Sequence, residues 1–175
     1  MSVLKLETLQ SALCAGAFSL ACQAAHATDQ VQGEASSFQT PNGSVERCVK
    51  IAPIPQGNYS KGDRKTQTEY CEIDFYAPDV ALCPKTWSTS PGMMVYAVGS
   101  GPYANNRAEF ERNACKEGKS ARNLAEDTLA KYKVTMNQSG TSGTFSASPL
   151  MYYHFSRYFD MEVLVPVAVW RTMDS

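Results

Sequence analysis

The fold is decided by residues 131–174, which read KYKVTMNQSGTSGTFSASPLMYYHFSRYFDMEVLVPVAVWRTMD. At the start of this stretch Tyr132, Val134 and Met136 alternate with polar side chains. Such a two-residue period is typical of a strand with one buried face, because successive side chains of a strand point to opposite sides. A half-buried strand is therefore predicted here, with Lys133 on the face opposite Tyr132.

A loop, a helix and a second strand are expected after this strand. Residues 138–147 are rich in glycine, serine and threonine, a composition typical of a loop. Ser148 followed by Pro149 indicates a helix start, with serine as the N-cap and proline in the first helical position. The apolar, β-branched run over residues 163–170 predicts a buried strand.

Shorter signals mark the strands that are expected earlier in the chain. Apolar residues that alternate or run together predict strands over residues 45–52, 69–76 and 93–98, and residues 80–82 form a short apolar run. Residues 56–68 are hydrophilic and contain glycines, so a loop is expected there.

Two helices are expected between the last of these strands and residue 131. Asn106, with Glu109 three residues later, resembles a capping box, and Gly118 suits the end of the helix that they begin. A second helix is expected over residues 120–129, because apolar residues recur there at helical spacing.

The composition bounds the class of protein. At 175 residues, with 43% hydrophobic and 19% charged residues, the chain fits one globular domain with an additional arm. Its formal net charge is −1, so neither a nucleic-acid partner nor an anionic membrane partner is expected.

The N-terminus has the layout of a secretory signal peptide over residues 1–27. A mostly apolar run is followed by Ala25-His26-Ala27, an A-x-A cleavage site, and polar sequence begins at Thr28. An uncleaved membrane anchor is the alternative, but the apolar run is short and interrupted for a membrane span. We therefore expect a secreted or periplasmic protein that has no stable membrane span after cleavage.

Export changes the interpretation of the cysteines. Four remain after the expected cleavage, namely Cys48, Cys71, Cys83 and Cys115. An even number in an oxidising compartment predicts two disulfides, although the sequence leaves all three possible pairings open. A zinc site is the alternative, but no pair has C-x-x-C spacing and His154 is the only histidine after the signal peptide.

The chain is thus expected to consist of a signal peptide (1–27), a polar arm (28–44) and one exported domain (45–175). The arm is rich in turn-forming residues and is expected to be disordered. For the domain we expect an α+β fold, with a small mixed sheet and about three helices, stapled by two disulfides.

No complete catalytic or metal-binding constellation is visible in the sequence. Gly99, Gly101 and Ala104 match a G-x-G-x-x-A pattern, but a dinucleotide fold needs a parallel strand after the next helix, and a second helix is expected instead. A tight turn is the simpler interpretation. His154 has no orienting partner in the sequence and is expected to pack among the aromatic residues of its helix. Neither catalytic residues, nor a metal, nor a cofactor is therefore expected.

The glycine-rich loop near the C-terminus is a candidate anion site. Loops like that of Gly140, Ser142 and Gly143 offer backbone N–H and hydroxyl donors and can form anion-binding nests. The loop is not a P-loop, because no G-K-[ST] sequence closes it. A surface connection without a ligand is the alternative interpretation.

Parts of this region resemble the N-terminal lobe of atypical, secreted or HipA-like kinases. The matching pieces are Tyr132-Lys133-Val134, the helical YYHFSR at residues 152–157, and Val165-Pro166. The resemblance implies that Lys133, rather than Lys131, would hold nucleotide phosphates, beside Gly140, Ser142 and Gly143 of the loop.

The resemblance covers under a third of the chain and departs from the kinase pattern in two respects. The helix lacks the glutamate that would pair with the strand lysine, and no acidic metal-binding motif follows before Ser175. It therefore implies no catalytic residue in this chain, and it would make the chain a fragment or a degenerate form of such a lobe.

Two functional hypotheses follow. The first is a recognition or scaffolding domain of the cell envelope or extracellular space, which binds an unknown ligand and is not catalytic. The alternative is the nucleotide-binding lobe of an atypical kinase-like enzyme that lacks its catalytic lobe.

Overall fold

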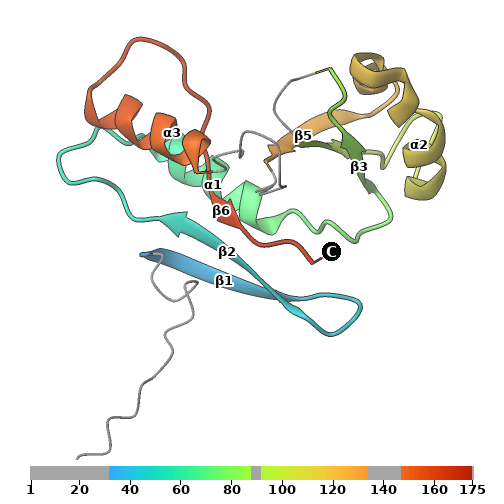
Figure 1. The fold of residues 1–175 in the computed structure, drawn as a ribbon, viewed down its shortest axis with the longest axis horizontal. Coiled ribbons are helices and arrows are strands. Elements are labelled where there is room, and N and C mark those ends of the chain that lie inside the picture. The colour runs from blue at the N-terminus through green and yellow to red at the C-terminus, as the bar shows by residue number, and fades with distance from the viewer. Residues whose placement is uncertain (1–31, 88–91, 134–146, 175) are drawn as a thin grey trace, which may run out of the picture. The chain divides into compact units, whose positions relative to one another are not determined.

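The computed structural model describes residues 32–87, 92–133 and 147–174. Within these residues the fold contains two three-stranded antiparallel sheets, three α-helices and one 3₁₀ helix (Figure 1). Two disulfides staple it. The α+β fold class is therefore confirmed, although the expected single mixed sheet is replaced by two antiparallel ones.

The first sheet has the strand order β1-β2-β6 and is built on a hairpin. β1 (Gly33–Gln39) pairs with β2 (Val45–Ile51), and β2 pairs with the short β6 (Trp170–Arg171). The strand expected over residues 45–52 is confirmed. The disordered arm expected over residues 28–44 is wrong from Gly33 onward, because β1 is held by backbone hydrogen bonds to β2. Its side chains are nearly all exposed, so its sequence lacks the apolar face that marks most strands.

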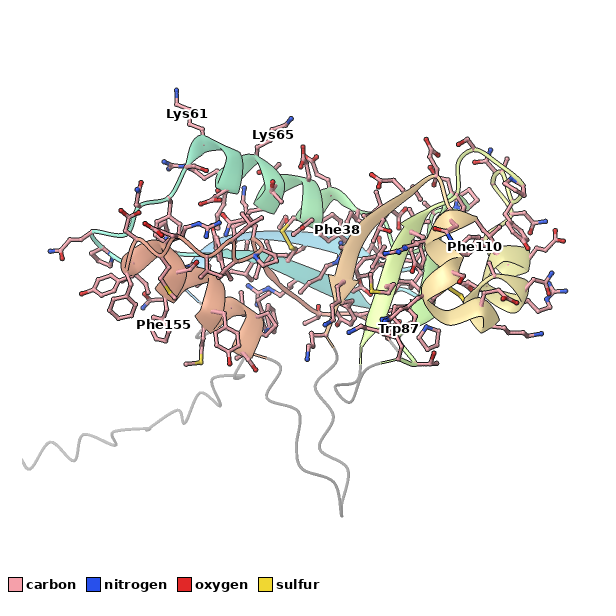
Figure 2. The ribbon with its side chains drawn as sticks, turned by 90° about the horizontal axis from the view of Figure 1, so that it is seen from above. Phe38, Lys61, Lys65, Trp87, Phe110 and Phe155 are labelled. Carbon is pink, nitrogen blue, oxygen red and sulfur yellow. A yellow bond between two sulfur atoms is a disulfide. The ribbon has the colours of Figure 1, made fainter. Side chains whose placement is uncertain are left out.

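The second sheet has the strand order β3-β4-β5. It consists of β3 (Val80–Pro84), β4 (Met93–Ala97) and β5 (Asp127–Tyr132), with a register irregularity at Val95 and Tyr96. Its two faces carry separate buried clusters, because side chains alternate along each strand. One cluster centres on Tyr96, Cys83 and Phe110, the last of which lies on the neighbouring helix α2 (Figure 2), and the other on Phe75, Leu82 and Val95.

Helix α1 (Lys61–Glu72) replaces the loop expected over residues 56–68 and the strand expected over residues 69–76, so both predictions are wrong. The Ser60 side chain accepts a hydrogen bond from the Asp63 N–H, and the Asp63 carboxylate accepts one from the Ser60 N–H. This capping box satisfies two backbone donors at the helix start. The buried residues of α1 lie four positions apart, which is a helical period: Asp63, Gln67 and Cys71.

Helix α2 (Arg107–Asn113) begins where it was expected, because the Asn106 side chain accepts a hydrogen bond from the Glu109 N–H. It is followed by the 3₁₀ helix η2 (Cys115–Asn123), in which Gly118 adopts a positive φ of 57°. The helix expected over residues 120–129 is wrong. The chain enters β5 at Asp127 instead, because pairing with β4 overrides the helical spacing of its apolar residues.

Helix α3 (Ser148–Tyr158) confirms the expected helix but not its cap. Ser148 is its first residue, and Ala147 occupies the N-cap position without a side-chain hydrogen bond. The strand expected over residues 163–170 is wrong, since only Trp170 and Arg171 pair with β2. Residues 161–164 are exposed, and Leu164 is 92% exposed, so this apolar run is not a buried strand.

The disulfides resolve the open pairing. Cys48 of β2 is bonded to Cys71 of α1, and Cys83 of β3 is bonded to Cys115 of η2. Each disulfide therefore links a strand to a helical segment, β2 to α1 and β3 to η2. In the part of the chain that the structure describes, no helix has both the length and the apolar character that a membrane crossing requires.

Candidate functional site

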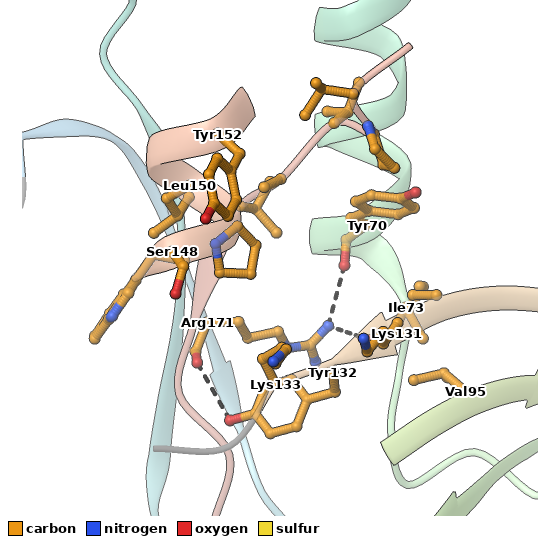
Figure 3. A pocket seen from close by; sticks show the side chains of 18 of the residues that line it. Tyr70, Ile73, Val95, Lys131, Tyr132, Lys133, Ser148, Leu150, Tyr152 and Arg171 are labelled. Atoms are coloured by element: carbon orange, nitrogen blue, oxygen red, sulfur yellow. Dashed lines mark hydrogen bonds between the residues drawn. The ribbon is translucent and has the colours of Figure 1, made fainter. Parts of the chain in front are cut away.

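A cavity of about 530 Å³ lies between the C-terminal end of α1, strand β5, the start of α3 and the extended residues 165–169 (Figure 3). Most of its lining is apolar, and the polar groups come from a few positions. The lining includes Tyr70, Ile73, Phe75, Ala130, Lys131, Tyr132, Lys133, Tyr152, Ala168 and Arg171.

Aromatic and cationic side chains pack on one another in the wall of the cavity. Phe75 and Tyr132 meet edge to face, with ring centroids 5.7 Å apart. The Arg171 guanidinium stacks on the Phe75 ring, 3.8 Å from its centroid. The Tyr132 hydroxyl donates a hydrogen bond of 3.4 Å to the Arg171 carbonyl oxygen, which joins β5 to β6. These contacts stabilise the wall in one arrangement.

Arg171 also closes the end of helix α1. Its Nη1 donates to the carbonyl oxygens of Ile73 at 2.6 Å and Tyr70 at 3.3 Å, groups that have no partner within the helix. Its Nη2 lies 3.7 Å from Oε2 of Glu46, and both side chains are almost fully buried. Burial lowers the pKa of Arg171, while the Glu46 carboxylate opposes that shift. The cavity wall therefore rests on a buried ion pair.

Glu46 is held by further partners. Its Oε1 accepts hydrogen bonds from the Asp174 N–H at 2.7 Å and from the Tyr76 hydroxyl. Burial, and then Glu46, raises the pKa of Tyr76 to about 12, so this hydroxyl keeps its proton. Sequence reasoning missed both members of the ion pair, since they lie 125 positions apart and no local pattern joins them.

Of the site residues predicted from the sequence, Lys133 borders the cavity. Lys133 directly follows β5, whose last residue, Tyr132, packs in the cluster of Phe75. Gly140, Ser142 and Gly143 lie outside the described residues. A phosphate-binding role for Lys133 and this loop therefore stays a prediction.

Comparisons with known proteins add no constraint. No protein-family model, curated protein or solved structure matches this chain. The proposal of a function therefore depends on the site itself, and the resemblance to kinase lobes stays a prediction.

An exposed apolar surface begins beside the cavity. Apart from Val45, all large apolar side chains that are exposed in the described part of the chain lie on α3 or just after it: Met151, Tyr152, Phe155, Tyr158, Phe159, Met161, Val163 and Leu164. Tyr152 belongs both to this surface and to the cavity lining. The surface and the cavity are thus continuous.

His154 is packed against the rings of Tyr59 and Tyr153, as expected. It is only 6% exposed, and its Nδ1 lies 2.7 Å from the Tyr59 hydroxyl. That hydroxyl also accepts a hydrogen bond from the Ile54 N–H, at 3.2 Å. Nε2 has no partner among the described residues. Burial lowers the pKa of His154, which favours the neutral ring.

A loss of stability below about pH 6.5 is expected from His154. The unfolded chain binds the proton near the ordinary histidine pKa, whereas the folded chain resists it, so unfolding takes up a proton as the pH falls. The contribution is complete above pH 6.5 and is lost as the pH falls toward the lowered pKa, by at most about 1.4 kcal/mol per pH unit. Urea unfolding between pH 7 and pH 5 measures this slope.

His154→Gln is the matched variant, because it removes the only titrating side chain of this kind after residue 27. Asp63 does not titrate in the same range, since its hydrogen bonds to Arg157 lower its pKa below the ordinary value of 3.8. The same pH slope in His154→Gln as in the wild type would contradict the assignment.

Arg157 and Asp63 form a structural contact. Nε of Arg157 donates to Oδ2 of Asp63 at 2.8 Å, and Nη2 donates to Oδ1 at 3.0 Å. Because Asp63 also caps α1, this bidentate pair fixes α3 against the start of α1. Within residues 32–87, 92–133 and 147–174 there is no group of three His, Cys, Asp or Glu side chains that is able to hold a metal ion.

Proposed function

We propose that the protein is an exported recognition domain that binds the apolar part of a ligand in the cavity between β5 and residues 165–169. The observation that carries the proposal is the cavity, with its volume of about 530 Å³ and its largely apolar lining. Binding sites for small molecules are typically hollows of about 300–1,000 Å³ with apolar walls and a few polar groups.

The wall of the cavity supports this role, because it is rigid before any ligand arrives. Arg171 is stacked on Phe75 and bonded to the end of α1, and Tyr132 is bonded to the Arg171 backbone. A preformed site does not need to order its own side chains when a ligand enters, and this reduces the cost of binding.

The proposed setting is the cell envelope or the extracellular space. The signal-peptide layout of residues 1–27 supports export, and the two disulfides fit an oxidising compartment. The exposed apolar surface next to the cavity supports recognition rather than catalysis, since such patches are typical of interaction sites.

The expected result is that a neutral apolar probe, N-phenyl-1-naphthylamine, binds saturably to the mature protein and fluoresces there. Ala168→Phe places a ring among the lining residues and should weaken this binding at least about tenfold, because the probe and the ring compete for one space. Ala104→Phe is the matched control, since Ala104 is exposed and is not part of the lining.

Circular dichroism and the melting temperature establish that each variant is folded. Either of two results would overturn the proposal: no saturable binding to the wild type, or equal binding to the wild type and to folded Ala168→Phe.

A further inference from the structure

Three lysines gather at one end of the second sheet. The Lys85 N–H donates to the Gly92 carbonyl oxygen at 2.9 Å, directly after the pairing of Pro84 with Met93. Met93 also pairs with Tyr132, so the next antiparallel step brings Lys133 opposite Gly92. Lys85, Gly92 and Lys133 thus form one row just beyond the paired residues of β3, β4 and β5.

Gly92, the central member of this row, has no side chain, and the Lys131 side chain lies over it. A Cβ atom on Gly92 would lie 3.8 Å from Cε of Lys131 and only 2.9 Å from the Tyr132 carbonyl oxygen. Lys131 therefore crosses over Gly92 from the neighbouring strand. Gly92 is therefore in close contact with the neighbouring strand, and the absence of a side chain lets Lys131 lie over it.

The positive charges of this cluster repel one another. Partial burial lowers the pKa of Lys131, and the neighbouring charges of Lys85 and Lys133 lower it further. Among the described residues no carboxylate lies within ion-pairing distance of Lys85 or Lys131.

The cluster is also continuous with the cavity. β5 is the outermost strand of its sheet, so the two faces of the strand meet at an open edge. The cavity accordingly borders Lys131 and Lys133 as well as Ala130 and Tyr132, whose side chains lie on the other face (Figure 3). A ligand in the cavity can therefore reach the lysines around this edge.

We propose that Lys85, Lys131 and Lys133 hold the acidic group of a ligand whose apolar body fills the cavity. The inference rests on the proposed function and names the ligand class as an amphipathic anion, such as an acyl or aromatic acid. An ammonium group holds a carboxylate, sulfonate or phosphate by charge-assisted hydrogen bonds, and three ammonium groups near one another supply several donors. A bound anion would also relieve the repulsion among the lysines.

Two probes that differ in charge test the inference. N-phenyl-1-naphthylamine is neutral, and 1-anilinonaphthalene-8-sulfonate has a similar aromatic body with an anionic group. We expect the sulfonate to bind the wild type about tenfold more tightly than the neutral probe. The double variant Lys131→Met and Lys133→Met should lose this preference, which is measured as the ratio of the two affinities.

The charge control is the double variant Lys61→Met and Lys65→Met. These two lysines stand out from α1 (Figure 2), and neither borders the cavity. The variant makes the same change in net charge, so a general electrostatic attraction would weaken sulfonate binding equally in both double variants. We expect it to leave the preference unchanged, and thermal melting checks that both double variants are folded.

The outcomes separate the two proposals. Equal affinity of the wild type for both probes, or equal loss of preference in both double variants, would overturn the lysine site and leave the cavity proposal intact. Failure of both probes to bind the wild type would overturn the proposed function, and the inference with it.

Discussion

Arg171→Met is expected to lower the free energy of unfolding by about 3–5 kcal/mol. The side chains of Arg171 and Glu46 are 5% and 2% exposed, so the substitution leaves the Glu46 carboxylate buried without its cation. It also removes the donor to the Ile73 and Tyr70 carbonyl oxygens at the end of α1. Urea unfolding followed by circular dichroism at pH 7 measures the loss.

Lys65→Met is the matched control for this effect. Lys65 pairs with Glu69 on the surface of α1, where both side chains are more than half exposed. Exposed pairs of this kind contribute roughly 0–1 kcal/mol, so the control should change stability little. If Arg171→Met costs no more than Lys65→Met, the buried ion pair does not stabilise the fold as described. Adding Glu46→Gln to Arg171→Met should recover part of the loss, because it removes the buried negative charge.

Loss of the Cys48–Cys71 disulfide is expected to cost about 3.5 kcal/mol. The two cysteines are 23 positions apart, and the bond restricts this loop in the unfolded chain. Both residues are buried, so the double variant Cys48→Ala and Cys71→Ala also leaves an underfilled space between β2 and α1. Denaturant unfolding of this variant and of the wild type gives the difference in stability.

The other disulfide provides an internal comparison. Cys83 and Cys115 are 32 positions apart, so restriction of the unfolded chain predicts nearly the same cost for the double variant Cys83→Ala and Cys115→Ala. A loss below about 1 kcal/mol in the first variant would contradict the structural role assigned to its bond.

The elements that could be predicted are those whose signals are local. β4 is a short apolar run, β2 has several apolar residues within seven positions, and α2 has its cap signal in Asn106 and Glu109. The two disulfides follow from an even number of cysteines after an export signal. Each of these predictions depends on residues that are close together in the chain.

The elements that were missed had local signals that conflict with the fold. Residues 69–76 alternate like a strand, yet the capping box of Ser60 and Asp63 begins a helix that includes the first half of them, 69–72. An S-x-x-D pattern is readable in the sequence and would have indicated this start. β1 has no apolar face, and only its pairing with β2 makes it a strand.

The cavity was beyond prediction because its walls come from distant segments. Arg171 meets Ile73 and Tyr70 across 98 and 101 positions, and the residues 165–169 that face β5 were expected to form a strand. Lys133 was predicted to lie opposite Tyr132, but the row of Lys85, Gly92 and Lys133 depends on pairing between strands that no local pattern reveals.

The most direct test of the central claim is an amide chemical-shift map of the mature, isotope-labelled protein titrated with N-phenyl-1-naphthylamine. Binding in the cavity predicts the largest shifts at Ile73, at Ala130–Tyr132 and at residues 167–171, with little change in α2. Shifts confined to the exposed apolar residues 155–164, or spread evenly over the protein, would contradict the account, because the probe would then occupy the surface rather than the cavity.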